Sequence, residues 1–385
     1  MRLTGTILLL VQVPIVSPPT LDERIPDDHT RAVGTGMSWR MPAETAPHDR
    51  IWMAFPRRGQ VLGSSAAEAE AGYAAWTNVA NAVAEFEPVT MVVDPLEADR
   101  ARQMLSFDIT VREAPLDDFW MRDFGPTFVF DHTGKLGAVD WIFNAWGGIA
   151  GASWGKDQEI ARFVAAEAGA ELVSSLLVNE GGAIHVDGEG TVLVTETVQL
   201  DPARNPFADR LRVERELERT IGATHVIWLP RGLTRDYEAL GTRGHVDMVA
   251  AIPSPGTLLL HRQDDPGHPD YTVCRDLRAF LEHTTDAAGR QWNIIDLPAP
   301  ATLSDDEGFV DWNYVNHLVV NDGIIACGYG EERADATARD ILQQAYPHRR
   351  VVTVDAREIL ARGGGIHCIT QQQPRSPNAG FGSSG

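Results

Sequence analysis

One hairpin pattern occurs four times in this 385-residue chain and narrows the possible folds more than any other part of the sequence. In each copy an apolar run meets a short turn that contains glycine, and a second apolar run follows. The turn glycines are Gly134, Gly190, Gly256 and Gly323, at intervals of 56, 66 and 67 residues. Glycine suits such turns because it adopts the positive φ that tight hairpins require. The regular spacing predicts a protein assembled from repeated supersecondary units.

A helix and a short strand are predicted after each hairpin. Apolar residues recur at helical spacing in ranges 156–169, 206–222, 270–284 and 332–346, and a strand-like segment follows each range. An earlier copy of the helix and strand lies at 66–86 and 89–94 without its own hairpin. The segments IWMAFP, near the start, and HCITQQQP, near the end, can supply that hairpin jointly. We therefore predict five strand–strand–helix–strand units, closed by pairing of the two chain ends.

Five such units joined end to end predict an α/β fold that closes into a five-bladed, pseudo-fivefold propeller, because closure leaves no exposed sheet edge. An open α/β sheet is the alternative. No P-loop and no GxGxxG after a first strand occurs, so a nucleotide-binding sheet has no local support. We place a single domain at 37–374, between a leader at 1–36 and a flexible, low-complexity tail at 375–385.

The leader contains an apolar run at residues 6–16 behind a single Arg2, which is a weak match to a secretory signal peptide. The run is too short to span a bilayer, and no small-residue cleavage site is evident. An upstream start codon is the alternative explanation, since Met37 and Met41 open the globular-looking sequence. We expect a cytoplasmic protein that makes no membrane contact, and secretion is the alternative.

The charge balance excludes one class of partner. The chain has 33 Lys and Arg residues against 54 Asp and Glu residues, a formal net charge of −21. Nucleic acid would be repelled by such a protein, so no nucleic-acid partner is expected. The same charge can attract a cationic small molecule, although acidity can also serve solubility alone.

The three cysteines are Cys274, Cys327 and Cys368, and they form no CxxC pair or zinc-type cluster. Cys368 follows GGGIH, and glycines permit close backbone approach. A thiol reacts as the thiolate, which a nearby cation stabilises. Cys274 and Cys327 lie in a predicted helix and strand, where buried inert thiols are usual. We predict that Cys368 is a nucleophile and that Gly365 lies beside its substrate.

Two carboxylates accompany the hairpins, Asp123 in FWMRDFGP and Asp247 in GHVD. A guanidinium presents its N–H donors in one plane, and carboxylates are its best partners. Two carboxylates on opposite edges would hold its carbon for attack and offset the cost of burying a cation. Each has a structural alternative: Asp123 can pair with Arg122 or cap a turn, and Asp247 can serve the hairpin.

His245 stands two residues before Asp247, so in a strand both side chains face one side. A histidine beside a carboxylate titrates near neutrality and can protonate a departing amine. Glu180 can orient this imidazole and raise its pKa. The alternative is that His245 is a buried core histidine whose ring nitrogens are both hydrogen-bonded. We assign His185, His225, His261 and His317 to the core, and we expect His367 to support the backbone.

Five stretches closely resemble the agmatine deiminase family, which belongs with the bacterial-type peptidylarginine deiminases in the pentein superfamily. They are MPAETAPHDRIWMAFP, FWMRDFGPTFV, NEGGAIHVDGEGTVLVTE, GHVD and GGGIHCITQQQP, in the family's order between residues 41 and 374. The resemblance implies the five-bladed propeller, catalysis without metal or cofactor, and a homo-oligomer. The implied reaction converts a guanidinium to a ureido group plus ammonia through a cysteinyl thiouronium, with agmatine giving N-carbamoylputrescine.

The resemblance also implies a role for each matching residue. Cys368 is the nucleophile, His245 the general acid and base, Asp123 and Asp247 the guanidinium ligands, Glu180 the support of the histidine, and Trp120 part of the pocket lining.

The sequence departs from the family pattern where the far end of the substrate would be read. Gly241, Arg243 and Met248 replace acidic residues and an Asn around GHVD, and RRGQVLGSS replaces a Trp-Arg element. We place Arg243 in the binding site, where an arginine would disfavour a second cation and can accept a carboxylate. Peptidylarginine or another small guanidino compound is therefore an alternative substrate, and amidinotransfer is a less favoured reaction.

Overall fold

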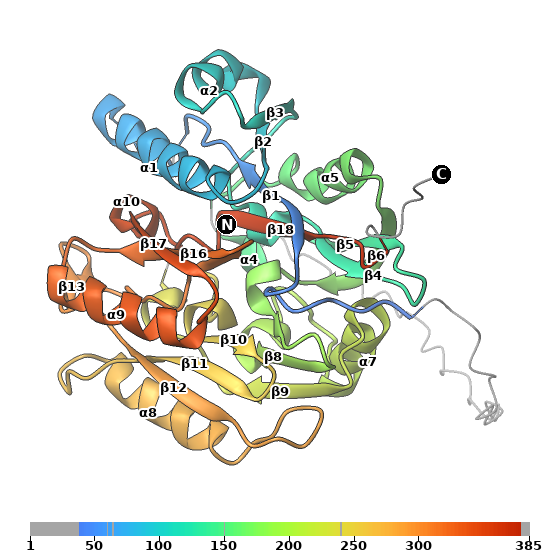
Figure 1. Ribbon diagram of the computed structural model, residues 1–385, viewed down its shortest axis with the longest axis vertical. Helices are drawn as coiled ribbons and strands as arrows, with labels where there is room; N and C mark the ends of the chain where they lie inside the picture. The colour runs from blue at the N-terminus through green and yellow to red at the C-terminus, as the bar shows by residue number, and fades with distance from the viewer. Residues whose placement is uncertain (1–37, 60, 64, 150, 239–240, 379–385) are drawn as a thin grey trace, which may run out of the picture. The chain divides into compact units, whose positions relative to one another are not determined.

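The structure is a computed structural model that describes residues 38–378 except 60, 64, 150, 239 and 240 (Figure 1). The predicted leader and residues 379–385 of the predicted tail lie outside the described residues. Arg375, at the start of that tail, donates to the carbonyl of Pro47 and pairs with Asp49. Within the described ranges, no helix has both the length and the hydropathy that a bilayer span requires.

Among the described residues, the strands form five sheets of three or four strands and one two-stranded ladder, β13 (Ser304–Asp305) with β14 (Gly308–Phe309). Four of the sheets share one plan, in which an antiparallel hairpin is followed by a helix and by a third strand parallel to the second. Their elements are β4 (Thr127–Phe130), β5 (Leu136–Ile142), α5 (Ile160–Ala168) and β6 (Glu171–Val178); β7 (His185–Val186), β8 (Thr191–Thr195), α7 (Arg210–Ile221) and β9 (His225–Leu229); β10 (Ala250–Ser254), β11 (Thr257–Arg262), α8 (Asp270–Leu281) and β12 (Asn293–Pro298); β15 (Leu318–Val320), β16 (Gly323–Gly328), α9 (Glu332–Ala345) and β17 (Arg350–Asp355). The predicted α/β repeat is therefore present in the structure.

The remaining sheet joins distant parts of the chain. Strand β1 (His48–Ala54) pairs in antiparallel fashion with β18 (Thr370–Pro374), and these blue and red strands lie side by side in Figure 1. Strand β2 (Val89–Val93) runs parallel to β1 on its other side, after helix α1 (Ala66–Ala84). The prediction that the two chain ends supply one hairpin is confirmed.

This sheet also has a strand that the sequence did not reveal. Strand β3 (Thr110–Glu113) follows the short helix α2 (Ala98–Met104) and runs parallel to β2. All of its residues are at least partly exposed, so it carries no buried apolar run that periodicity can detect.

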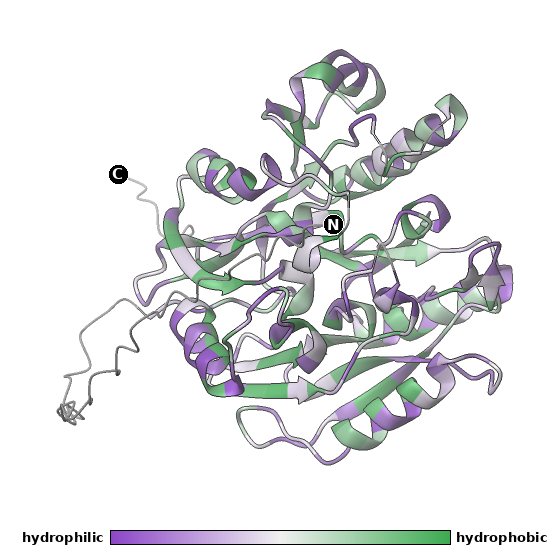
Figure 2. Ribbon diagram, turned by 180° about the vertical axis from the view of Figure 1, so that it is seen from behind, coloured by the Kyte–Doolittle hydropathy of each residue, from purple (hydrophilic) through white to green (hydrophobic). Residues whose placement is uncertain are grey.

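Helix boundaries follow ordinary capping chemistry. Helix α7 begins after Asp209, whose side chain accepts from the N–H of Arg212, and ends at Gly222 in the left-handed conformation. Val213, Leu217 and Ile221 are buried, whereas Leu211 and most of the charged residues are exposed. Such an uneven distribution gives the mixed colouring of the helices in Figure 2.

The hairpin turns confirm the glycine prediction in three cases and correct it in the fourth. Gly134, Gly190 and Gly256 have φ values of +79°, +113° and +75°. In the fourth hairpin Asp322 takes the positive φ, +57°, and Gly323 lies inside β16. Gly323 is required for packing instead, because a Cβ there would lie 2.4 Å from the ring of Phe86.

Short helical segments next to the hairpins carry the predicted site residues. They are α3 (Met121–Phe124), η3 (Gly181–Ala183) and η5 (Val246–Met248). Segment η3 contacts both α3 and η5, and α3 also contacts β18. The GHVD segment is thus a 3-10 turn and not the strand that we predicted, yet it still brings His245 and Asp247 to the same centre.

Candidate active site

The thiol of Cys368 lies in the turn that precedes β18 and is only 5% exposed. The side chain of Asn316 donates to its Sγ at 3.3 Å, and Asp247 Oδ2 lies 3.7 Å from the same sulfur. Burial, with added repulsion from the carboxylates of Asp247 and Asp123, raises the pKa of this thiol well above its ordinary value. A backbone hydrogen bond from Gly365 acts in the opposite direction. The resting group is therefore a neutral thiol, and a cation bound beside the carboxylates would favour the thiolate.

Asp123 is held from two sides. Its Oδ2 accepts from the indole of Trp146 at 2.9 Å, and its Oδ1 accepts from the N–H of Gly182 at 3.2 Å. Burial raises its pKa to about 6, although His245 partly compensates for the burial. The alternative pairing with Arg122 is wrong, because that guanidinium donates to the carbonyl of His367 and to Glu44 instead.

The two oxygens of Asp247 differ in their surroundings. Oδ2 accepts from a ring nitrogen of His367 at 2.8 Å, whereas the buried Oδ1 has no hydrogen-bond partner among the described residues. Burial opposes ionisation of Asp247, but the hydrogen bond and charge of His367, together with His245, lower its pKa below the ordinary value. Asp247 is therefore a charged carboxylate with one oxygen free for a donor.

His245 lies between the carboxylates. Its Nε2 is 3.2 Å from Glu180 Oε2, and its Nδ1 is 3.8 Å from Asp123 Oδ1 without a hydrogen bond in the described part of the chain. Burial disfavours the charged ring, but Asp123, Glu180 and Asp247 together raise its pKa to about 9. At neutral pH His245 is an imidazolium with an N–H at Nδ1.

Glu180 is itself anchored by a buried arginine that sequence reasoning missed. Arg204 Nε donates to both oxygens of Glu180, at 2.9 and 3.2 Å, and its Nη1 binds Asp201 at 3.0 Å. Burial alone would raise the pKa of Glu180, but Arg204 and His245 lower it below the ordinary value. Glu180 is therefore a charged partner that holds the imidazole by Nε2 and leaves Nδ1 facing the centre.

Gly182 shows how tightly these groups converge. A Cβ at this position would lie 2.6 Å from His245 Nδ1, 2.9 Å from Asp123 Oδ1 and 3.0 Å from Asp247 Oδ2. The NEGG sequence thus admits three functional side chains to one point, because no other residue leaves enough space.

Two glycines before the thiol act in a similar way. A Cβ at Gly365 would lie 2.3 Å from Asn316 Oδ1, and one at Gly364 would lie 2.8 Å from the Trp120 ring and 3.1 Å from Cys368 Sγ. Trp120 and Gly365 therefore lie near the thiol, and their roles in substrate binding stay predictions.

Trp146 occupies a strained backbone position. Trp146 and its neighbour Ala145, at the start of the short helix α4 (Ala145–Gly148), both have a φ of +55°. Non-glycine residues seldom adopt this conformation, and such strain concentrates at functional sites. Here it brings the indole N–H to Asp123.

Arg243 is the predicted site residue that the structure does not bring into the buried centre. Its side chain is 54% exposed, and its Nε lies 3.5 Å from Asp201, which also binds Arg204. Its place in substrate recognition stays a prediction.

Cys274, Cys327, His185, His261 and His317 are buried, as predicted, whereas His225 is only partly buried and is not a core histidine. Burial raises the pKa of Cys274 to about 12 and that of Cys327 to about 11, and lowers the pKa of His261 to about 3 and that of His317 to about 4. His367 differs from its predicted role as a support of the backbone. It lies in a turn, and its side chain bridges Asp247 and Glu44 at 2.8 Å each.

The residues that sequence reasoning missed are Glu44, Trp146, Arg204 and Asn316. A usable signal existed for Asn316, because it stands directly before the fourth hairpin, where the other hairpins carry their functional residues. Glu44 lies inside the MPAETAPHDR stretch that carried the resemblance, but no spacing rule connects it to His367.

A repeated ββαβ fold whose centre holds a buried cysteine, an imidazolium and paired carboxylates defines a class of enzymes that modify guanidino groups. The sequence model of a family described as Porphyromonas-type peptidyl-arginine deiminase matches residues 40–374. A Streptomyces coelicolor protein is 52% identical over 341 residues, covering 88% of this chain and 100% of the relative. An agmatine deiminase of Ectopseudomonas mendocina is 42% identical, covering 89% of this chain and 97% of its own.

A solved structure of an agmatine deiminase is also similar to this chain. The agmatine deiminase of Enterococcus faecalis superposes with a TM-score of 0.82 at 33% identity, covering 90% of this chain and 99% of its own. The chain therefore belongs to the agmatine deiminase family.

Proposed function

We propose that this protein hydrolyses agmatine to N-carbamoylputrescine and ammonia through a covalent intermediate on Cys368. The observation that carries the proposal is the convergence of His245, Asp123 and Asp247 around Gly182, with the thiol 3.7 Å from Asp247. The relatives named agmatine deiminase support the choice of substrate.

Binding comes first in this mechanism. The guanidinium lies between Asp123 and Asp247, and the free Oδ1 of Asp247 accepts one of its N–H groups. Carboxylates that repel a thiolate in the resting enzyme are neutralised by the bound cation, so the pKa of Cys368 falls when substrate arrives. Trp120 and Gly365 line the space beside the thiol.

Two half-reactions follow. Cys368 loses its S–H proton to solvent when the bound cation lowers the pKa of the thiol, and the thiolate attacks the guanidinium carbon. The tetrahedral adduct expels ammonia after the departing nitrogen takes the Nδ1 proton of His245. The neutral imidazole then removes a proton from water, which attacks the thiouronium carbon. Cleavage of the C–S bond frees the ureido product, and the hydroxyl proton of this second adduct restores the thiol of Cys368. Glu180 holds the imidazole throughout by its Nε2.

We further propose that residues 37–374 form one domain in which the five sheets are the blades of a pseudo-fivefold α/β propeller. The recurrence of one strand plan in successive sheets, and the pairing of β1 with β18, support this arrangement. In such a ring the segments beside the hairpins meet at the axis.

A second candidate substrate has specific support. The matching family is described as peptidyl-arginine deiminase, and Arg243 replaces an acidic residue expected beside GHVD. An arginine there would favour a carboxylated or peptidyl guanidine over a diamine-like tail.

The test gives purified protein agmatine, arginine, a peptidyl-arginine and 4-guanidinobutyrate separately, and measures ammonia and ureido product. Turnover of agmatine in preference to the others is the expected result. Preference for a carboxylated or peptidyl substrate would keep the chemistry and overturn the substrate, and amidino transfer without free ammonia would overturn the reaction.

A further inference from the structure

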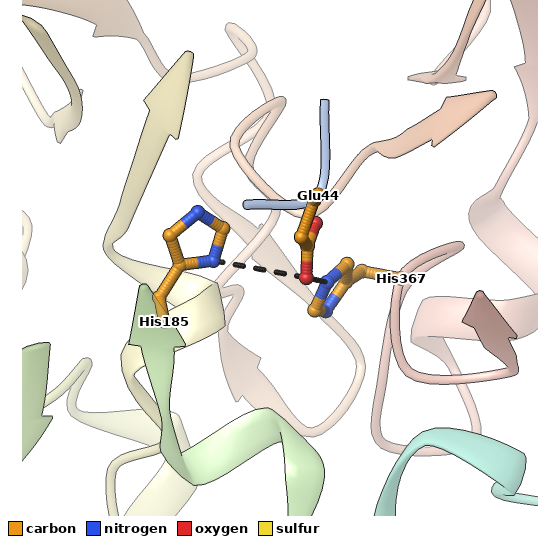
Figure 3. Close-up of side chains that lie close together, drawn as sticks. All are labelled: Glu44, His185 and His367. Carbon is orange, nitrogen blue, oxygen red and sulfur yellow. Dashed lines mark hydrogen bonds and ion pairs between the residues drawn. The ribbon is translucent and has the colours of Figure 1, made fainter. Parts of the chain in front are cut away.

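A second cluster of ionisable groups lies directly behind Asp247. Glu44, His185 and His367 are all buried, and Figure 3 shows the Glu44 carboxylate between the two imidazoles. Glu44 Oε1 is 2.8 Å from His367 Nε2 and 4.0 Å from His185 Nδ1. The reaction outlined above uses none of these three side chains.

The hydrogen bonds of this cluster do not suit a metal ion. His185 Nε2 accepts the N–H of Ile252 at 2.9 Å, so the proton of a neutral His185 must be on Nδ1, the nitrogen that faces Glu44. A metal needs a lone pair at that atom. His367 has no unused nitrogen either, because each one contacts a carboxylate oxygen.

The two contacts of His367 determine its protonation. Nδ1 is 2.8 Å from Asp247 Oδ2, and Nε2 is 2.8 Å from Glu44 Oε1. Ionised carboxylates only accept hydrogen bonds, so both ring nitrogens must donate and the ring carries two protons. The charged or titratable groups that face His367 are Glu44, Asp247, Arg122, His185 and His317.

Charge supports the same assignment. Burial and Arg122 oppose a charged ring, but Glu44 and Asp247 outweigh them and raise the pKa of His367. Burial also opposes ionisation of Glu44, yet His367 and Arg122 keep its pKa well below the ordinary value. The chain Glu44–His367–Asp247 is thus an imidazolium between two carboxylates, sealed from solvent.

We propose that Glu44 and His367 are positioning residues: Glu44 holds His367 as an imidazolium, and this imidazolium binds Asp247 Oδ2 so that the Asp247 carboxylate stays ionised and fixed beside the thiol, where the substrate guanidinium binds. The assignment of charge rests on the two short contacts of His367, and the charges around it support the same assignment. Its consequence for the enzyme rests on the proposed function, in which Asp247 binds the guanidinium.

Glu44→Gln removes the charge of the Glu44 carboxylate and keeps the size of the side chain. A glutamine amide can donate to His367 Nε2, which lets the ring become neutral while its Nδ1–H still reaches Asp247. Without the cation at His367, burial raises the pKa of Asp247, so part of the carboxyl is protonated and cannot accept the guanidinium. Substrate and transition state are then bound less tightly by a similar amount. We expect KM to rise about tenfold with a smaller change in kcat.

The first measurement is ¹⁵N NMR of histidine-labelled protein at pH 7, with the His367 signals among 12 histidines identified by their loss in His367→Gln. Two protonated nitrogens in the wild type and one in Glu44→Gln are expected. An unprotonated ring nitrogen on wild-type His367 would overturn the proposal, whether or not the protein turns over agmatine.

The second measurement is the split between KM and kcat for Glu44→Gln, with Glu87→Gln as the matched control. Glu87 is also a buried carboxylate paired with a histidine, His48, at 3.2 Å, but it does not contact Asp247. The control should lower the melting temperature and leave KM unchanged.

A KM within twofold of wild type in Glu44→Gln would overturn the positioning role, and the same criterion applies to His367→Gln if Glu44→Gln does not fold. Absence of agmatine turnover by the wild type would instead contradict the proposed function. In that case KM is measured with a guanidino compound that the protein does turn over. If the protein turns over none of them, the NMR result alone decides the proposal.

Discussion

At the scale of single residues, Cys368 combines a buried thiol with two nearby carboxylates, and this environment suppresses the thiolate until a cation binds. Cys368→Ser keeps the size of the side chain and removes the nucleophile. We expect turnover to fall at least about 1,000-fold with an unchanged melting temperature. Ammonia release and thermal unfolding check this.

The matched control is Cys274→Ser, which alters another buried thiol, in α8, whose pKa is about 12. It should retain full activity. Full activity of Cys368→Ser would rule out the covalent mechanism.

The two perturbed groups at the centre predict a bell-shaped pH profile. Asp123 must be ionised to bind a guanidinium, so kcat/KM should fall as pH decreases through about 6, its pKa. His245 must carry a proton for the departing ammonia, so kcat/KM should fall as pH rises through about 9. Initial rates from pH 5 to 10 test both limbs, and His245→Ala should release no ammonia. An alkaline limb absent up to pH 10 would remove His245 from the acid role.

At the scale of elements, the 3-10 turn η3 matters because its middle residue has no side chain. Gly182→Ala would place a methyl group within 3.0 Å of His245, Asp123 and Asp247. We expect activity to fall at least about 100-fold, since displacement of reacting groups by about 1 Å has this effect.

Gly155→Ala is the control for this substitution, because a Cβ at that exposed glycine meets no atom within 4 Å. Its activity should match the wild type. If the two alanine variants were equally active, the close convergence around Gly182 would be contradicted.

The elements also show why some of the site was predictable and some was not. Hairpin and helix patterns follow from local periodicity, and Asp123, Glu180, His245 and Asp247 were found because each stands beside a hairpin. Arg204 and Trp146 act through contacts with residues 24 and 23 positions away, and Glu44 acts through a contact with His367, 323 positions away. No local pattern encodes such contacts, so only the fold reveals them.

At the scale of the whole molecule, the pairing of β1 with β18 joins the two ends of the described chain. A protein that ends at residue 369 lacks β18 and exposes one edge of β1. We expect this truncation to abolish cooperative unfolding and activity, while a protein that ends at residue 378 should match the wild type. Circular dichroism melting curves and ammonia release measure the difference. An active, cooperatively folding protein without β18 would show that the pairing is dispensable.

The same pairing has a consequence for biosynthesis. Cys368, the proposed nucleophile, lies just before the strand that completes the first sheet. We expect it to reach its environment only after residues 370–374 have left the ribosome and paired with β1. A nascent chain that already contains Asp123, Glu180, His245 and Asp247 but lacks this strand therefore has an incomplete site. We expect activity to appear only after this strand has been made and has paired with β1.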